Sequence, residues 1–80
     1  MKKKVKLIFP QHLVKEPIIF AMAKTYDVMP NIRRARVTDS GGEMILELDG
    51  QQENLDKGIG ALKNQGVEVF FIEADDAEWR

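Results

Sequence analysis

The side chains that could perform catalysis or bind a metal are few in this sequence. There is a single histidine, His12, and there is no cysteine. A lone histidine with no second ligand and no carboxylate beside it is typical of a solvated loop residue. Without cysteine the chain has no disulfide, no iron–sulfur ligand, no thiol nucleophile and no Cys-x-x-Cys metal site. The sequence therefore predicts no metal, no cofactor and no enzymatic activity.

Three arginines, Arg33, Arg34 and Arg36, are clustered in the middle of the chain. Guanidinium groups bind carboxylates and phosphates through paired hydrogen bonds, so this cluster could receive an anionic ligand. Charges on an edge strand are also a common protection against sheet-to-sheet aggregation. The sequence leaves both interpretations open.

Two further patterns do not indicate a site. Asp75, Asp76 and Glu78 belong to an acidic tail, Ala74–Arg80, which is not a preorganised acid–base pair. Gly58 and Gly60 lie inside a predicted helix, whereas a dinucleotide-binding glycine motif follows a strand and opens a helix. Because glycine costs up to about 1 kcal/mol relative to alanine in a helix, this pair predicts close packing against a neighbouring element.

Length and composition predict one folded domain. The 80 residues are 44% hydrophobic and 31% charged, which argues against disorder. The formal net charge of −1 disfavours a general nucleic-acid binder. No apolar run is long enough to span a membrane, so membrane insertion is not expected. We expect a single cytoplasmic domain over residues 1–80, with an ordered core at about 4–73.

Hydrophobic periodicity predicts four strands and two helices. The strands are expected at Lys4–Phe9, Ile32–Thr38, Glu43–Asp49 and Val67–Glu73, and the helices at 17–26 and 52–65. A hairpin turn is expected at Asp39–Gly42, a helix stop at Asp27–Asn31 and a C-terminal cap at Gly66. The alternation of the second strand slips near Arg33 and Arg34, and one extra residue there, a β-bulge, would restore it.

The order of these elements defines a fold class. Strand–helix–strand, hairpin and helix–strand form the split βαβ arrangement, and right-handed crossovers then fix the topology. The prediction is an α+β, ferredoxin-like βαββαβ sandwich. Its antiparallel sheet has the strand order 4-1-3-2, and both helices cover one face.

The face of the sheet without helices is predicted to carry large apolar side chains. Ile8, Ile45 and Phe70 fall on neighbouring strands of this face, and Ile72 continues the pattern of the last strand. Such a patch is expected to be an interface with a second copy, a ligand or a partner domain. Alternatively, the aliphatic stems of nearby lysines and glutamates shade it within one chain.

The sequence resembles the NIL domain over about residues 4–73. The resemblance rests on the order and spacing of Lys4–Phe9, Glu16–Ile19, Val28, Asn31-Ile32, Gly41-Gly42, Met44–Leu48 before Gly50, and Gln65–Val69. NIL domains are known as regulatory domains at the C-terminus of the ATPase subunits of methionine ABC transporters. There they pair across a two-fold axis and bind methionine, which inhibits transport. They also occur alone or fused to ferredoxin-type modules in proteins linked to sulfur assimilation.

The resemblance implies a ligand site at the start of the second strand. The Asn-Ile-Leu signature of the family corresponds to Asn31, Ile32 and Arg33, so this chain departs from it at the third position. A guanidinium at a usually apolar position favours a more anionic ligand. Asn31 would then hydrogen-bond the polar head of the ligand, and Arg33 or Arg34 would offset a carboxylate.

The function expected from the sequence is therefore a non-enzymatic homodimer that senses methionine or a related sulfur amino acid. The expected ligand site comprises Asn31, Ile32, Arg33 and Arg34, and the expected interface comprises Ile8, Ile45, Phe70 and Ile72. The alternative is a protein-docking module for a ferredoxin-type or sulfur-assimilation partner that binds no small ligand.

Overall fold

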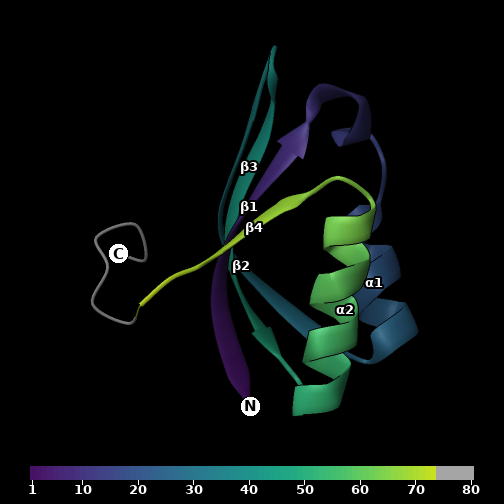
Figure 1. Ribbon diagram of the computed structural model, residues 1–80. Helices are drawn as coiled ribbons and strands as arrows, with labels where there is room; N and C mark the ends of the chain where they lie inside the picture. Colours follow the sequence, from purple (N-terminus) through teal and green to yellow (C-terminus); the bar gives the residue numbers. More distant parts are fainter. Residues whose placement is uncertain (74–80) are drawn as a thin grey trace.

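The computed structural model describes residues 1–73, so the acidic tail with Asp75, Asp76 and Glu78 lies outside the described residues. The elements follow one another as β1 (Lys2–Pro10), the short 3₁₀ helix η1 (Gln11–Leu13), α1 (Ile18–Tyr26), β2 (Met29–Thr38), β3 (Gly41–Asp49), α2 (Gln52–Asn64) and β4 (Glu68–Phe71). All neighbouring strands are antiparallel and their order is β2-β3-β1-β4. Figure 1 shows both helices on the same side of the sheet. The predicted fold class and strand order are confirmed.

The core forms because each strand presents every second side chain to the helices. Val5 and Leu7 of β1 and Leu46 and Leu48 of β3 are almost fully buried on this side. The helices complete the cluster with apolar side chains at three- and four-residue spacing: Ile18, Ile19 and Met22 of α1, and Leu55, Ile59 and Leu62 of α2. One continuous core thus fixes the sheet beneath α1 and α2.

The predicted element boundaries are wrong by a few residues at several ends. β2 begins at Met29 rather than at Ile32, and Pro30, expected to be part of the helix stop, lies within it. Proline is tolerated there because β2 is an edge strand, where a missing N–H costs least. Gly41 and Gly42 belong to β3 rather than to the turn, and β4 ends at Phe71 rather than at Glu73.

Two predicted local features are confirmed. The pairing of β2 with β3 shifts register between Ile32 and Arg34, so a β-bulge lies where the alternation slips. At the end of α2, the amide of Gly66 donates to the carbonyl of Lys63 at 3.0 Å, and that of Val67 donates to Leu62 at 3.1 Å. Gly66, with a φ of +102°, therefore ends α2 directly after the C-cap residue Gln65, as a glycine commonly does.

The two glycines within α2 have different surroundings. A Cβ on Gly58 would lie 2.8 Å from Sδ of the buried Met22 in α1, so this glycine allows the two helices to approach closely. Among the described residues, nothing lies within 4 Å of a Cβ on Gly60. The expectation of close packing is confirmed at Gly58 and wrong at Gly60.

Gly60→Ala is therefore expected to raise the free energy of unfolding by up to about 1 kcal/mol, because alanine favours the helix and meets no neighbour. Gly58→Ala is expected to raise the free energy of unfolding by less, since the thioether of Met22 must move to make room for the new Cβ. Urea denaturation followed by circular dichroism compares the two variants. Equal gains at both positions would contradict the packing role of Gly58.

Candidate functional site

The bulge in β2 decides which face of the sheet each residue of the expected ligand site occupies. Asn31 pairs with Glu47 and Arg34 pairs with Ile45, and both of these partners point away from the helices. Ile32 pairs with Leu46, which points into the core, so Ile32 lies on the helix side. Because Arg33 is the inserted residue, Asn31 and Arg34 share the helix-free face although they are three positions apart. All four residues are exposed.

One row of side chains crosses the helix-free face from edge to edge. The strand register aligns Arg34 of β2, Ile45 of β3, Lys6 of β1 and Phe70 of β4. Ile45 is 2% exposed although no helix covers it, whereas Phe70 is 50% exposed. Ile8 and Ile72 are half-buried. The exposed part of the expected apolar patch is thus smaller than the sequence suggests, because Ile45 is buried and Phe70 alone of the four is exposed.

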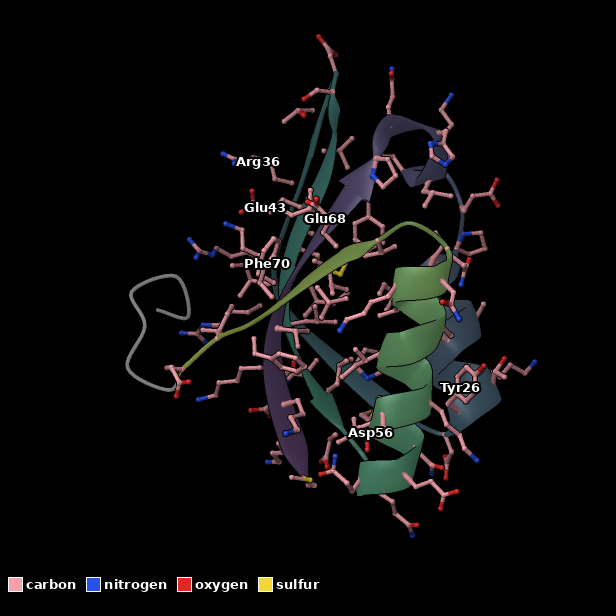
Figure 2. The ribbon with its side chains drawn as sticks, in the orientation of Figure 1. Tyr26, Arg36, Glu43, Asp56, Glu68 and Phe70 are labelled. Atoms are coloured by element: carbon pink, nitrogen blue, oxygen red, sulfur yellow. The ribbon has the colours of Figure 1, made fainter. Side chains whose placement is uncertain are left out.

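Ion pairs surround this row. The carboxylate of Glu43 lies 3.9 Å from Nζ of Lys6 and 3.4 Å from the guanidinium of Arg36. Lys2 and Glu47 approach to 4.0 Å at the other end of the strands. Figure 2 shows Arg36 and Glu43 beside each other above Phe70. These pairs are partly exposed and each contributes roughly 0–1 kcal/mol, so they add little to the stability of the fold.

A shallow depression of about 550 Å³ lies between these side chains, and we call it the open-face basin. It is lined by Arg34, Ala35, Arg36, Glu43 and Ile45. Its volume is in the range of small-molecule sites, roughly 300–1,000 Å³. Two guanidinium groups, one carboxylate and an apolar side chain suit a small zwitterion or anion with an apolar part. The structure thus brings Arg34 and Ile45 together and leaves Asn31 and Ile32 outside the basin.

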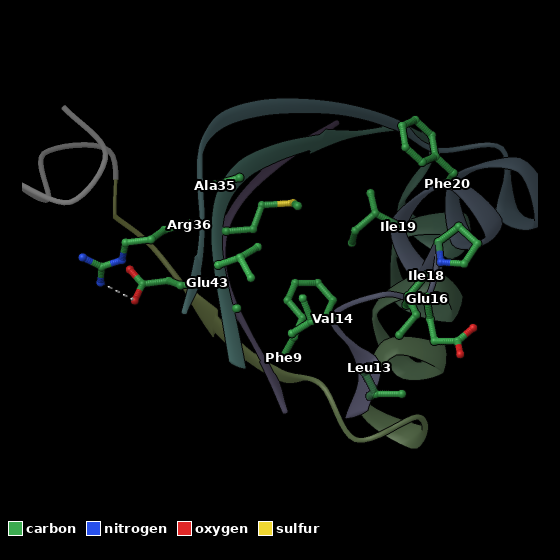
Figure 3. A pocket seen from close by; sticks show the side chains of 14 residues that line it. Phe9, Leu13, Val14, Glu16, Ile18, Ile19, Phe20, Ala35, Arg36 and Glu43 are labelled. Atoms are coloured by element: carbon green, nitrogen blue, oxygen red, sulfur yellow. Dashed lines mark hydrogen bonds and ion pairs between the residues drawn. The ribbon is translucent and has the colours of Figure 1, made fainter. Parts of the chain in front are cut away.

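A second, apolar hollow lies on the opposite side of β2, and we call it the α1–β2 groove. It measures about 160 Å³, and its lining includes Val14, Ile19, Phe20, Ala35, Val37 and Met44. Figure 3 shows Phe20 and Ile19 on one side of it and Ala35 on the other, with the Arg36–Glu43 pair beyond the sheet. No pattern in the sequence led us to expect this groove. Two residues could have indicated it: Phe20, an exposed aromatic on the outer side of α1, and Val37, an apolar residue on the helix side of an edge strand.

The other candidate residues do not form a site. His12 is exposed in η1. Within residues 1–73, no group of three or more histidine, cysteine, aspartate or glutamate residues is placed to hold a metal ion. No helix in the same part of the chain is long and apolar enough to cross a membrane.

The fold is that of a small α+β, ferredoxin-like domain. The sequence model of the NIL domain matches residues 3–70. The chain therefore belongs to the NIL domain family.

Two relatives agree with this assignment. The chain is 30% identical to the methionine import ATP-binding protein MetN of Coxiella burnetii over 95% of its length, and it spans 24% of that protein. It also resembles the crystal structure of the C-terminal domain of an ABC transporter ATP-binding protein from Enterococcus faecalis. That match has a TM-score of 0.78 and 26% identity, and it covers 91% of this chain and 86% of the other.

A more distant likeness concerns the fold alone. The C-terminal domain of the MgtC protein from Mycobacterium tuberculosis gives a TM-score of 0.58 at 16% identity, covering 95% of this chain and 92% of the other. The expected membership of the NIL family and the ferredoxin-like fold are both confirmed.

Proposed function

We propose that this NIL domain is a non-enzymatic, cytoplasmic regulatory domain that binds methionine or a related sulfur amino acid. The observation that carries the proposal is the open-face basin beside the β2 bulge, on the strand that bears Asn31. The name of the relative from Coxiella burnetii concerns methionine import, which supports the ligand class. The relative from Enterococcus faecalis is a domain of an ABC transporter ATP-binding protein, which supports a regulatory role.

The chemistry of the segment suits the two ends of an amino acid. Arg34 lines the basin and offers a guanidinium to a carboxylate, and Ile45 offers an apolar contact. Asn31 lies further along the same face of β2, where its side-chain amide can donate to a carboxylate or accept from an ammonium group. Arg33 is the residue inserted at the bulge, next to Arg34 in the chain, so it adds positive charge to this segment of β2.

Ligand binding is proposed to be coupled to pairing of two copies. The helix-free face offers Phe70 at 50% exposure, with Ile8 and Ile72 half-buried beside it. A second copy that covers these side chains would remove apolar surface from water. A ligand that binds the pair better than the single chain then shifts the equilibrium toward the pair by mass action.

Calorimetric titration with methionine, homocysteine and cysteine tests the proposal. We expect saturable binding of at least one of them, and we expect Arg34→Ala, which removes a guanidinium from the lining of the basin, to weaken it tenfold or more. A hydrogen bond to a charged group contributes roughly 1.5–3 kcal/mol, and about 1.4 kcal/mol corresponds to a factor of ten. Lys24→Ala, on the exposed side of α1, serves as the matched control and is expected to bind as the parent chain does.

The coupling is measured separately by sedimentation equilibrium with and without the ligand. Heat without a change in association would mean that amino-acid binding is not coupled to pairing. No heat from any of the three amino acids would remove the sensing role and favour a domain that acts by protein docking alone.

A further inference from the structure

β2 is an edge strand with two chemically different sides. It stands at one end of the strand order, and within residues 1–73 no other strand pairs with its outer edge. All of its ten residues except Pro30 are exposed. Every second residue of such a strand directs its N–H and C=O groups outward, which offers a template for another strand. Beyond the bulge, residues 34–38 form a regular stretch of this template.

The helix side of this stretch is apolar and hollow. Val37 is 69% exposed and Phe20 of α1 is 72% exposed, and both line the α1–β2 groove. At about 160 Å³ the groove is well below the range of whole-ligand pockets, roughly 300–1,000 Å³. Its size suits one aliphatic side chain, and its position suits a side chain carried by a strand that lies along β2.

The helix-free side of the same stretch is basic. Arg34 and Arg36 lie on this side, opposite Ile45 and Glu43 of β3. The side chain of Arg36 is 72% exposed while it contacts Glu43, so its guanidinium retains donors for a further carboxylate. Opposite charges on adjacent strands stabilise pairing, and like charges directly opposite destabilise it.

We infer that the outer edge of β2 binds an extended peptide segment of a partner protein in which acidic and apolar residues alternate. The segment adds as a fifth strand, with an apolar side chain in the α1–β2 groove and carboxylates beside Arg34 and Arg36. This docking site goes beyond the amino-acid binding proposed above and does not depend on it.

A second copy of the chain fits this edge less well. A two-fold antiparallel pair of β2 strands centred on Ala35 sets Arg34 of each copy opposite Arg36 of the other. Centring the pair on Arg36 sets that residue opposite itself. Since both registers oppose guanidinium groups, the charge pattern favours an acidic partner.

The test uses the full chain and a fluorescein-labelled peptide, Thr-Glu-Val-Glu-Leu-Glu-Thr, blocked at both ends. Fluorescence anisotropy is expected to show saturable binding that weakens as salt is raised. Two control peptides carry either lysine in place of glutamate or N-methyl groups on alternate amides, which remove the donors needed for strand pairing. Both are expected to bind at least tenfold more weakly.

Variants of the chain locate the site. Val37→Lys is expected to weaken binding tenfold or more, whereas Thr25→Lys, an exposed change on α1, should leave it unchanged. Arg36→Glu should weaken binding of the glutamate peptide and improve binding of the lysine peptide. Hydrogen exchange should show protection of the amides in residues 34–38 when the peptide is added, and Val37→Lys should abolish this protection.

Three results would overturn the inference. The first is no saturable binding of the glutamate peptide. The second is binding that withstands both Val37→Lys and N-methylation. The third is a dimer in which the same edge is already protected by a second copy and the peptide does not compete. Methionine titration of the Val37→Lys chain separates this inference from the proposed function, because amino-acid binding should survive that change.

Discussion

Gly41→Ala is expected to destabilise the fold by about 3 kcal/mol, which is the scale of a forced backbone strain combined with a steric conflict. Gly41 has a φ of +149°, a conformation that residues with a side chain rarely adopt. A Cβ there would also collide with the backbone carbonyl oxygen of Phe9 on the adjacent β1. That oxygen belongs to a central strand of the sheet, so it cannot move aside as a flexible side chain would.

Gly42→Ala is the matched control, one residue further along β3. The nearest atoms to its Cβ would be the carbonyl oxygen of Arg36 and a methyl of Val14, both at an ordinary 3.6 Å. We expect this variant to change the free energy of unfolding by less than about 1 kcal/mol. Urea denaturation of both variants gives the comparison. Equal midpoints would mean that the β1–β3 pairing near the hairpin can open without cost.

The difference between these neighbours shows where sequence reasoning stops. A pair of glycines after Asp39-Ser40 predicts a hairpin, and a hairpin is present. Which glycine is indispensable depends on its φ and on the nearest atom of another strand, and neither is encoded in a local pattern. The same holds in α2, where Gly58 meets Met22 and Gly60 meets nothing within 4 Å among the described residues.

The fold and the bulge were predictable because both arise from periodicity. Four segments with alternating apolar residues and two helices with an apolar stripe predict the βαββαβ topology. The interrupted alternation at Arg33 predicts the β-bulge. The faces of Asn31 and Arg34 then follow from the register. The α1–β2 groove was not predictable, because it depends on how far α1 extends over the edge strand. Periodicity assigns Val37 to the helix side but does not show that no helix covers it there.

For Ile45, on the helix-free face, the sequence predicts the face of the sheet correctly but not the burial of the side chain. Ile45 was expected on this face, and the register places it there, between Arg34 and Lys6. Its 2% exposure could not be predicted, because strand alternation assigns a face to a side chain but does not determine how much of it is covered. Ile45 is thus buried outside the main core cluster, which does not include it.

Ile45→Ala is accordingly expected to lower the free energy of unfolding by about 2 kcal/mol, even in a single chain. Large-to-small changes at buried isoleucines cost roughly 2–5 kcal/mol, and the lower end applies because Ile45 lies outside the main core cluster. Phe70→Ala, in the same row but half-exposed, is expected to cost less than about 1 kcal/mol of stability. Thermal unfolding at low protein concentration, where association contributes least, measures both.

When self-association is measured instead of stability, Phe70→Ala should have the larger effect and Ile45→Ala the smaller one. If the helix-free face pairs in the proposed dimer, Phe70→Ala removes an exposed contact and should weaken self-association, whereas Ile45→Ala should affect it little beyond its effect on folding. Sedimentation equilibrium at matched fractions of folded protein makes that comparison. Equal loss of stability in both variants would mean that Phe70 contributes as much to folding as Ile45 does. The surface available for pairing would then be confined to the edges of the sheet.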